Sequence, residues 1–419
     1  MKYYLDPDWQ NSMKIRLDYN NMMSRIIGDE HGLTFEQINS ISEIVEKVHE
    51  QIQNKTGKGN DFLGFLSLPE IKESEINKIK EVANKLADTS DIFITLGIGG
   101  SYLGAKALVE ALNSPYYNEL TRENRNKRPR IYFEGNNIDS DSLNYLFDLL
   151  PDTKPLRLEN DFSLSVISKS GATIETAVAF RLFQEKTRKI YGDKHNEHIV
   201  AITDQSKGKL KAIADKENYQ TFVIPDDVGG RYSVLTPVGL FPAAVVGVDI
   251  EELLAGARYM RKFCENSELA KNPAYMYAAL QYLSSKKGRN ISVMACWSKA
   301  LENIGFWYDQ LCAESLGKEQ KGRAPITIVD TRDLHSRGQQ LQEGEQNTVV
   351  TNLFVENSNR EIIFKKDDLS LDDLNYLDGK SLKSMLLGAM EGTNYAYAKA
   401  QRPTMNVILP QINAFTLGQ

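Results

Sequence analysis

The chain has 419 residues, of which 41% are hydrophobic and 25% are charged, and its formal net charge is -6 at pH 7. This length predicts two domains or one large two-lobed unit, with ample chain for buried cores. The negative net charge argues against broad nucleic-acid binding, which needs an accumulated basic face. An anionic ligand would therefore be held by cations placed locally.

The cysteines indicate a reducing compartment. Cys264, Cys296 and Cys312 are odd in number and lack metal-ligand spacing, so we expect free thiols in a cytoplasmic protein and no metal site. Residues 1–20 contain no apolar signal-peptide core, and no stretch approaches the ~18 apolar residues of a membrane span. Neither secretion nor membrane insertion is expected.

The first half of the chain alternates strand and helix patterns. Helical patterns with one polar face cover residues 35–53 and 70–88. Strand patterns follow, with helical patterns such as 103–112 and 174–190 between them, at residues 92–96, 130–134, 164–168, 198–203 and 220–224. Such alternation predicts a parallel sheet covered on both faces.

The second half repeats this plan, with helical patterns near 251–264, 273–286, 300–314 and 381–400, and strand patterns at 290–296, 325–329, 349–355 and 406–409. We therefore expect an α/β fold of two doubly wound parallel-sheet lobes. The predicted division is a helical segment over 1–90, a first lobe over 91–245 and a second lobe over 246–419. A site is expected where the carboxyl ends of strands from both lobes face a shared cleft.

Two strand-to-helix junctions favour a phosphate ligand. The strand at 92–96 opens into Gly97–Gly104, and the strand at 164–167 opens into Ser168–Thr176, which contains Lys169. Backbone N–H groups at a helix start, hydroxyls and one lysine form a ready phosphate site. The simpler alternatives are a tight turn at the first junction and helix capping by Ser170 or Thr173 at the second.

Neither junction has the pattern of a nucleotide-binding loop. Tyr102 occupies the place where the dinucleotide fingerprint needs its third glycine, and the sequence contains no Gly-x-x-x-x-Gly-Lys-Ser/Thr run. A sugar phosphate is therefore the expected ligand.

Two further segments place charged groups at structural junctions. Gly229 and Gly230 precede Arg231 shortly after an apolar strand, although a turn with a surface arginine is the simpler interpretation. Glu314 falls at the end of a helical pattern just before Gly317, where the helix dipole disfavours a carboxylate. A functional acid or a solvated surface glutamate would both explain it.

His335 follows the apolar strand at 326–329, whereas the other four histidines lie in strongly polar stretches, at His31, His49, His195 and His198. An imidazole titrates near neutral pH and suits proton transfer. A structural or solvated histidine is the alternative.

Taken in their order along the chain, these motifs resemble those of the phosphoglucose isomerase family in its shorter bacterial type. The landmarks are Gly-Ile-Gly-Gly-Ser at 97–101, Ser-Lys-Ser-Gly at 168–171, Gly-Gly-Arg-Tyr-Ser at 229–233, Glu-Ser-x-Gly-Lys at 314–318 and Asp-Leu-His at 333–335. The resemblance runs from about residue 40 to residue 419. It implies two sugar-isomerase lobes, a homodimer, and a cofactor-free interconversion of glucose 6-phosphate and fructose 6-phosphate.

The resemblance also implies roles for particular residues. Glu314 would move the proton between C2 and C1, His335 would help to open the sugar ring, and Arg231 would stabilise the enediolate. Gly100, Arg231 and Gln310 would border the sugar. The phosphate would be held by Ser101, Ser168, Lys169, Ser170 and Thr173.

The resemblance leaves one departure and two alternatives. Family members carry a later segment with a phosphate-binding glutamine and a lysine beside the histidine, and no Phe-Asp-Gln run occurs within residues 1–419. A non-catalytic sugar-phosphate-binding regulator would fit that departure. An isomerase of another sugar phosphate is the second alternative, and Arg231 and His335 speak against it.

Overall fold

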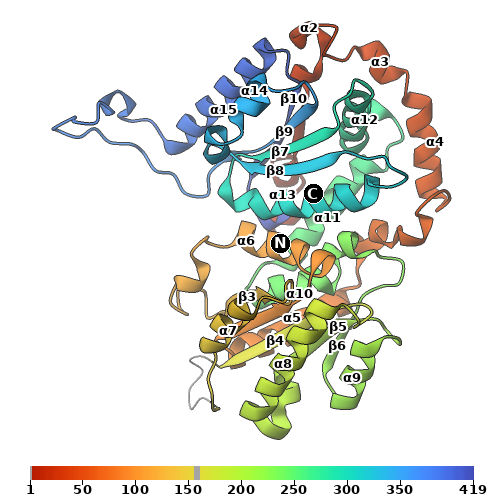
Figure 1. The fold of residues 1–419 in the computed structure, drawn as a ribbon, viewed down its shortest axis with the longest axis vertical. Coiled ribbons are helices and arrows are strands. Elements are labelled where there is room, and N and C mark those ends of the chain that lie inside the picture. Colours follow the sequence, from red (N-terminus) through yellow and green to blue (C-terminus); the bar gives the residue numbers. More distant parts are fainter. Residues whose placement is uncertain (1, 155–160) are drawn as a thin grey trace. The chain divides into compact units, whose positions relative to one another are not determined.

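The computed structural model describes residues 2–154 and 161–419. The chain divides into two compact units, one formed by residues 1–54 and 255–419 and the other by residues 55–254. We call them unit 1 and unit 2 and describe each by itself (Figure 1).

Unit 2 is built on a five-stranded sheet whose order is β3-β2-β4-β5-β6. Its strands are β2 (Ile92–Leu96), β3 (Arg130–Glu134), β4 (Phe162–Ile167), β5 (Ile199–Thr203) and β6 (Gln220–Val223). All neighbouring pairs are parallel. Every residue of β2, β4 and β5 is buried, as expected for a parallel sheet covered on both faces. The five predicted strands of the first half are confirmed.

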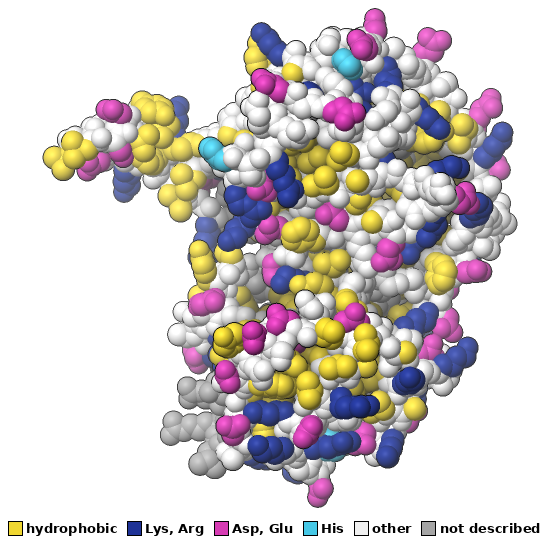
Figure 2. Space-filling view, viewed as in Figure 1, with side chains coloured by type: hydrophobic (Ala, Val, Ile, Leu, Met, Phe, Trp, Pro, Cys, Tyr) yellow, Lys and Arg dark blue, Asp and Glu magenta, His cyan; other side chains and the backbone are white. Residues whose placement is uncertain are grey.

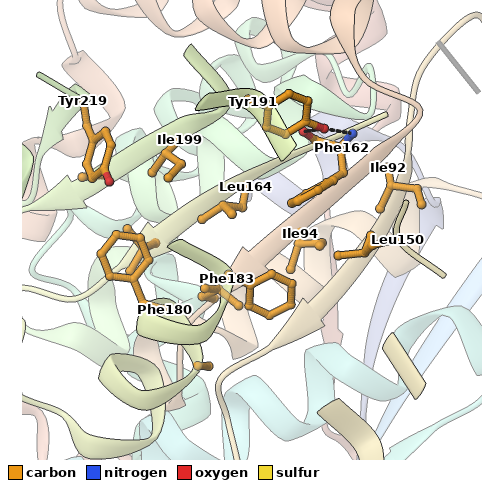
Figure 3. Packing of buried hydrophobic residues seen from close by; sticks show 14 of the residues in the cluster. Ile92, Ile94, Leu150, Phe162, Leu164, Phe180, Phe183, Tyr191, Ile199 and Tyr219 are labelled. Carbon is orange, nitrogen blue, oxygen red and sulfur yellow. Dashed lines mark hydrogen bonds between the residues drawn. The ribbon is translucent and has the colours of Figure 1, made fainter. Parts of the chain in front are cut away.

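Helices cover both faces of this sheet. They are α5 (Glu73–Thr89), α6 (Leu103–Leu112), α7 (Ser140–Asp148), α8 (Ile174–Tyr191), α9 (Lys209–Glu217) and α10 (Pro237–Val245). On one face, α7, α8 and α9 bury a cluster that includes Ile94, Leu164 and Phe183 (Figure 3). On the other face, Phe93 of β2 meets Phe241 of α10 at a ring distance of 6.0 Å. Successive side chains of a strand point to opposite faces of the sheet, so Phe93 and Ile94 pack into two separate cores.

Unit 1 contains the second sheet, in the order β1-β10-β9-β7-β8. Its strands are β1 (Arg16–Asp18), β7 (Ile291–Cys296), β8 (Ala324–Val329), β9 (Thr348–Asn357) and β10 (Thr404–Gln411). The four longer strands run parallel, and they confirm the four predicted strands of the second half. The short β1 pairs antiparallel with β10, with Arg16 opposite Ile408. The sequence analysis missed β1 because three residues carry too little pattern.

The helices of unit 1 are α1 (Pro7–Ser12), α2 (Ser24–Ile27), α3 (Phe35–Asn39), α4 (Ser42–Gln53), α11 (Ile250–Cys264), α12 (Pro273–Lys286), α13 (Glu302–Leu316), α14 (Gly338–Glu343), α15 (Leu382–Lys399) and α16 (Ala414–Gly418). The division between the units falls within α11. The predicted helix over 35–53 is two helices, which are separated at Ser40 and Ile41. A capping box formed by Thr34 and Gln37 begins the short α3.

The start of the chain does not form one segment with residues 55–90. Met22, Met23 and Ile38 are buried against α12 and the sheet of unit 1, whereas α5 packs on α10 of unit 2. The boundaries of unit 2 therefore fall at residues 55 and 254 and differ from the predicted boundaries at 90 and 245. Hydrophobic burial by each segment, which the sequence pattern does not reveal, decides this assignment.

The last helix, α16, begins at Ala414, three residues after the end of β10 at Gln411. The Asn413 side chain caps it by accepting a hydrogen bond of 2.8 Å from the Thr416 N–H. Phe415 is fully buried and meets the ring of Trp9 at 5.1 Å. Docking of this one aromatic side chain stabilises a helix that is too short to persist alone.

Candidate functional site

The first candidate loop, Gly97–Ser101, leaves the carboxyl end of β2 and continues into α6. Its glycines are needed for its shape, because Gly99 has a φ of +55°. A β-carbon on Gly97 would lie 2.4 Å from the Ser101 carbonyl oxygen. The loop therefore turns back on itself and presents Ser101 at the start of a helix.

Gly100 brings a second motif to this loop. A β-carbon on Gly100 would lie 2.2 Å from the Gly230 carbonyl carbon and 2.7 Å from the Arg231 nitrogen. The Ser233 hydroxyl donates to the Gly230 carbonyl at 2.6 Å and also approaches the Gly100 carbonyl at 3.3 Å. Two segments that lie far apart in the chain are thus in backbone contact.

The neighbours of Arg231 hold its side chain in place. The guanidinium carbon lies 4.6 Å from the centre of the Tyr232 ring. That ring stacks on Phe65 with a centroid distance of 4.7 Å. A guanidinium resting on an aromatic face is preorganised and keeps its full positive charge.

The second candidate loop, Ser168–Thr173, connects β4 to α8. The buried Ser168 hydroxyl accepts a hydrogen bond of 3.0 Å from the Gly171 N–H, and the Ser170 hydroxyl accepts one of 3.2 Å from the Ala172 N–H. Gly171 has a φ of +65°, and a β-carbon there would lie 2.2 Å from the Leu210 nitrogen. The loop is a compact turn whose N–H groups and hydroxyls gather at the start of an 18-residue helix.

Helix capping accounts for only part of this loop. Thr173 is the N-cap residue of α8, yet its side chain makes no capping hydrogen bond within the described part of the chain. Ser170 bonds to a loop N–H group before the helix begins. The first turn of α8 therefore keeps N–H groups and a hydroxyl for an anion.

The Lys169 ammonium group contacts the segment after β6 and lies 3.5 Å from the Asp226 carboxylate. It donates to the carbonyl oxygens of Pro225 at 3.2 Å and Asp226 at 2.9 Å in that segment. The predicted contact of Lys169 with phosphate thus requires the ammonium group to exchange or share these carbonyls. That contact stays a prediction.

In unit 1, α13 carries Gln310 and Glu314 one turn apart. The Gln310 amide donates to a carboxylate oxygen of Glu314 at 2.8 Å. Glu314 is exposed near the end of the helix, which Gly317 terminates. The amide therefore orients a carboxylate that lies at the surface.

His335 ends a short 3-10 turn, Arg332–His335, that follows β8. Asp333 braces this turn by accepting a hydrogen bond of 2.8 Å from the Val329 N–H and by pairing with Arg332 at 2.9 Å. The hydrogen bond from Arg332 lowers the pKa of Asp333 to about 2, so the brace is ionised near neutral pH. The imidazole itself is exposed.

The structure thus joins the predicted residues in three groups. Gly100 and Ser101 lie with Arg231, the loop after β4 holds Ser168, Ser170 and Thr173, and Gln310 contacts Glu314. His335 stands at the exit of β8, as predicted.

The sequence analysis missed Asp330, a buried acid directly after β8. Burial, followed by the nearby charge of Asp333, raises its pKa to about 7. An acid immediately after the apolar run Ile326–Val329 was the available signal.

Within residues 2–154 and 161–419, no group of three or more His, Cys, Asp or Glu side chains is arranged to hold a metal ion. None of the helices there has the length and apolar character needed to cross a membrane.

The contact at Gly100 gives the first prediction. Gly100→Ala should destabilise unit 2 by about 1 to 3 kcal/mol, the usual cost of overpacking, because the methyl group would meet backbone atoms of Gly230. Hydrogen exchange of residues 97–101 and 229–231 should become faster. In Gly388→Ala, where open space surrounds the glycine, exchange in these segments should not change. Wild-type exchange in Gly100→Ala would contradict the contact.

Comparison with known proteins identifies the family. A phosphoglucose isomerase family model matches residues 73–335. A glucose-6-phosphate isomerase of Fusobacterium nucleatum is 43% identical over 406 residues, which cover 97% of this chain and 87% of that protein. A glucose-6-phosphate isomerase of Bacillus thuringiensis strain Al Hakam is 42% identical over 409 residues, covering 97% and 88%.

Solved structures agree. A hypothetical protein from Thermus thermophilus has a TM-score of 0.84 at 26% identity, over 97% of this chain and 90% of that one. A glucose-6-phosphate isomerase from Chlamydia trachomatis has a TM-score of 0.75 at 18% identity, over 96% and 85%, and shows the same fold. Given the family model and relatives at 42% and 43% identity, the chain belongs to the phosphoglucose isomerase family.

Proposed function

We propose that this protein interconverts glucose 6-phosphate and fructose 6-phosphate as an aldose-ketose isomerase that uses no cofactor. Membership of the phosphoglucose isomerase family carries this assignment. The observation on the molecule itself that supports it most directly is the Glu314 carboxylate, held by the Gln310 amide at the end of α13. No observation favours a non-catalytic regulator.

Glu314 is the proposed base. Moving hydrogen between C2 and C1 needs one group that takes a proton from one carbon and returns it to the other on the same face. A single carboxylate oriented by a neutral amide fits this work, because the amide fixes its direction without neutralising it.

Arg231 and His335 are assigned the remaining chemical steps. The enediolate formed after proton removal carries negative charge, which a preorganised guanidinium stabilises. Arg231 rests on the Tyr232 ring and suits this role. Ring opening moves a proton between the ring oxygen and the anomeric hydroxyl, and an exposed imidazole at His335 suits that transfer.

The phosphate is assigned to unit 2. Ser168, Ser170 and Thr173 gather hydroxyls at the start of α8, and Ser101 stands at the start of α6. Gly100 permits the close backbone approach beside the sugar. Lys169 adds positive charge at the edge of the loop.

We also propose a homodimer in the cytoplasm. Residues 358–380 of unit 1 project as an extended segment, closed at its base by a hydrogen bond of 2.8 Å from the Phe364 N–H to the Lys380 carbonyl (Figure 1). Figure 2 shows hydrophobic side chains gathered on it, and its exposed large residues are Ile362, Ile363, Leu369, Leu371 and Tyr376. So much exposed apolar surface favours burial against a second copy.

The cysteines support the proposed cytoplasmic location. All three are free, which suits a reducing compartment.

The base is tested by Glu314→Gln. Turnover of fructose 6-phosphate should fall by about 100-fold to 10,000-fold, the range for one acid-base group, while phosphate affinity is kept. The wild-type protein should place solvent deuterium at C2 of the glucose 6-phosphate formed. Glu319→Gln, a control change just past the end of α13, should keep normal turnover. If the Glu314 variant retained more than about a tenth of the activity, against that range, the assignment would be wrong.

The proposed phosphate loop, Ser168–Thr173, is tested by Ser168→Ala combined with Thr173→Ala. The apparent dissociation constant for glucose 6-phosphate should rise about tenfold or more, because hydrogen bonds to a charged group are lost. Free glucose should bind the wild-type protein at least ~100-fold more weakly than glucose 6-phosphate. Calorimetry measures both, and equal affinities for glucose and glucose 6-phosphate would refute the site.

The dimer is tested by light scattering of the full chain. Leu369→Asp combined with Leu371→Asp should shift the mass toward one chain, because each change places a charge in the proposed interface. Ile44→Asp alters another exposed apolar residue, on α4, and should leave the mass unchanged. A single-chain mass for the unaltered protein at micromolar concentration would contradict the proposal.

A further inference from the structure

The four parallel strands of unit 1 repeat the order of the first four strands of unit 2. In unit 2 the first strand, β2, lies between the second, β3, and the third, β4. In unit 1 the first parallel strand, β7, likewise lies between the next two, β8 and β9. In such sheets the order in which successive strands are added reverses between the first and third strands, and ligands bind outside the carboxyl ends of the strands there.

Unit 1 has a pocket of about 610 Å³ at this position, within the size range of small-molecule sites. Its walls come from the segments that end or follow all four parallel strands, together with the start of α15. They include Trp297, Ser298 and Lys299 after β7, Asp330–Arg332 after β8, Asn357–Asn359 at the end of β9, and Ile412 after β10. Lys383 and Leu386 come from α15.

The charges in this pocket favour an anion. Arg332 forms ion pairs with Glu302 at 3.1 Å and with Asp333 at 2.9 Å. The Lys383 ammonium group donates at 3.2 Å to the neutral Asn357 side-chain oxygen and forms no ion pair among the described residues, although the Glu361 carboxylate accepts a hydrogen bond of 3.4 Å from the Lys383 backbone N–H. Lys299 is exposed and forms no ion pair within residues 2–154 and 161–419.

The pocket also contains an unsatisfied acceptor. Asp330 is only 7% exposed, and within the described residues its Oδ1 atom has no hydrogen-bond partner. A buried acceptor without a partner is costly. A ligand hydroxyl near Asp330 would supply the missing donor, while Ser298, Thr331 and Ser358 supply hydroxyls to an anion.

We propose that this pocket binds a hydroxyl-bearing phosphate monoester, separately from the substrate, with its phosphate at Lys299 and Lys383 and a hydroxyl at Asp330. The site does not depend on the catalytic roles proposed above, because none of the residues assigned to those roles lines this pocket. Arg332 belongs to the turn that ends with His335, so an occupant would restrain that turn.

Calorimetry of the full chain with sorbitol 6-phosphate tests this proposal, since this compound has no carbonyl group and cannot be isomerised. The unaltered protein should bind two molecules per chain. In the Ser168→Ala, Thr173→Ala variant, the substrate site should be weakened and the site in unit 1 should remain at full affinity. Adding Lys299→Gln and Lys383→Gln to that variant should weaken the remaining site about tenfold, whereas adding Lys47→Gln, an exposed charge on α4, should not.

Inorganic phosphate separates the two parts of the proposed site. In the same weakened background, Asp330→Asn should weaken binding of sorbitol 6-phosphate without weakening binding of inorganic phosphate, because only the former donates a hydroxyl to Asp330. Failure to find the remaining site, or a remaining site indifferent to Lys299 and Lys383, would overturn the proposal. Two sites of unchanged affinity in the Ser168→Ala, Thr173→Ala variant would instead count against the phosphate loop of unit 2.

Discussion

The close approach of Gly100 to Gly230 and Arg231 is the constraint on which the organisation of unit 2 depends. A β-carbon at Gly100 would overlap the Gly230 carbonyl, so the loop after β2 and the segment after β6 meet only because neither carries a side chain at the contact. Ser233 then bonds to both carbonyls and locks the arrangement. This backbone contact fixes the position of the Arg231 backbone.

The remaining candidate groups are likewise positioned by the ends of regular elements. Ser168–Thr173 follows a fully buried strand and precedes a long helix, and these two elements restrict the positions of its hydroxyls and N–H groups. Glu314 is held near the end of α13 by an amide one turn earlier. His335 ends a turn braced by the ionised Asp333. The strands and helices thus hold the candidate side chains in place, and most of these side chains lie on the short segments that connect them.

The repeated strand order gives both units a position suited to ligands. In unit 2 it carries glycines and hydroxyls, which fit a phosphate approached closely by backbone. In unit 1 it carries Trp297, Lys299, Lys383 and the buried Asp330. The topology places a pocket at the reversal point, and the side chains decide what that pocket accepts.

Much of this protein was determined by local sequence. All nine predicted strands exist, because continuous apolar runs bounded by glycine and polar residues have few alternatives in a parallel sheet. The order of the motifs sufficed to predict the family and the candidate residues. Tertiary structure alone decided the rest, including the joining of residues 1–54 to unit 1, the contact of Gly100 with Gly230, the direction of Lys169 and the burial of Asp330. Each of these depends on segments far apart in the chain, and the burial and close contacts that fix them leave no periodic trace in the sequence.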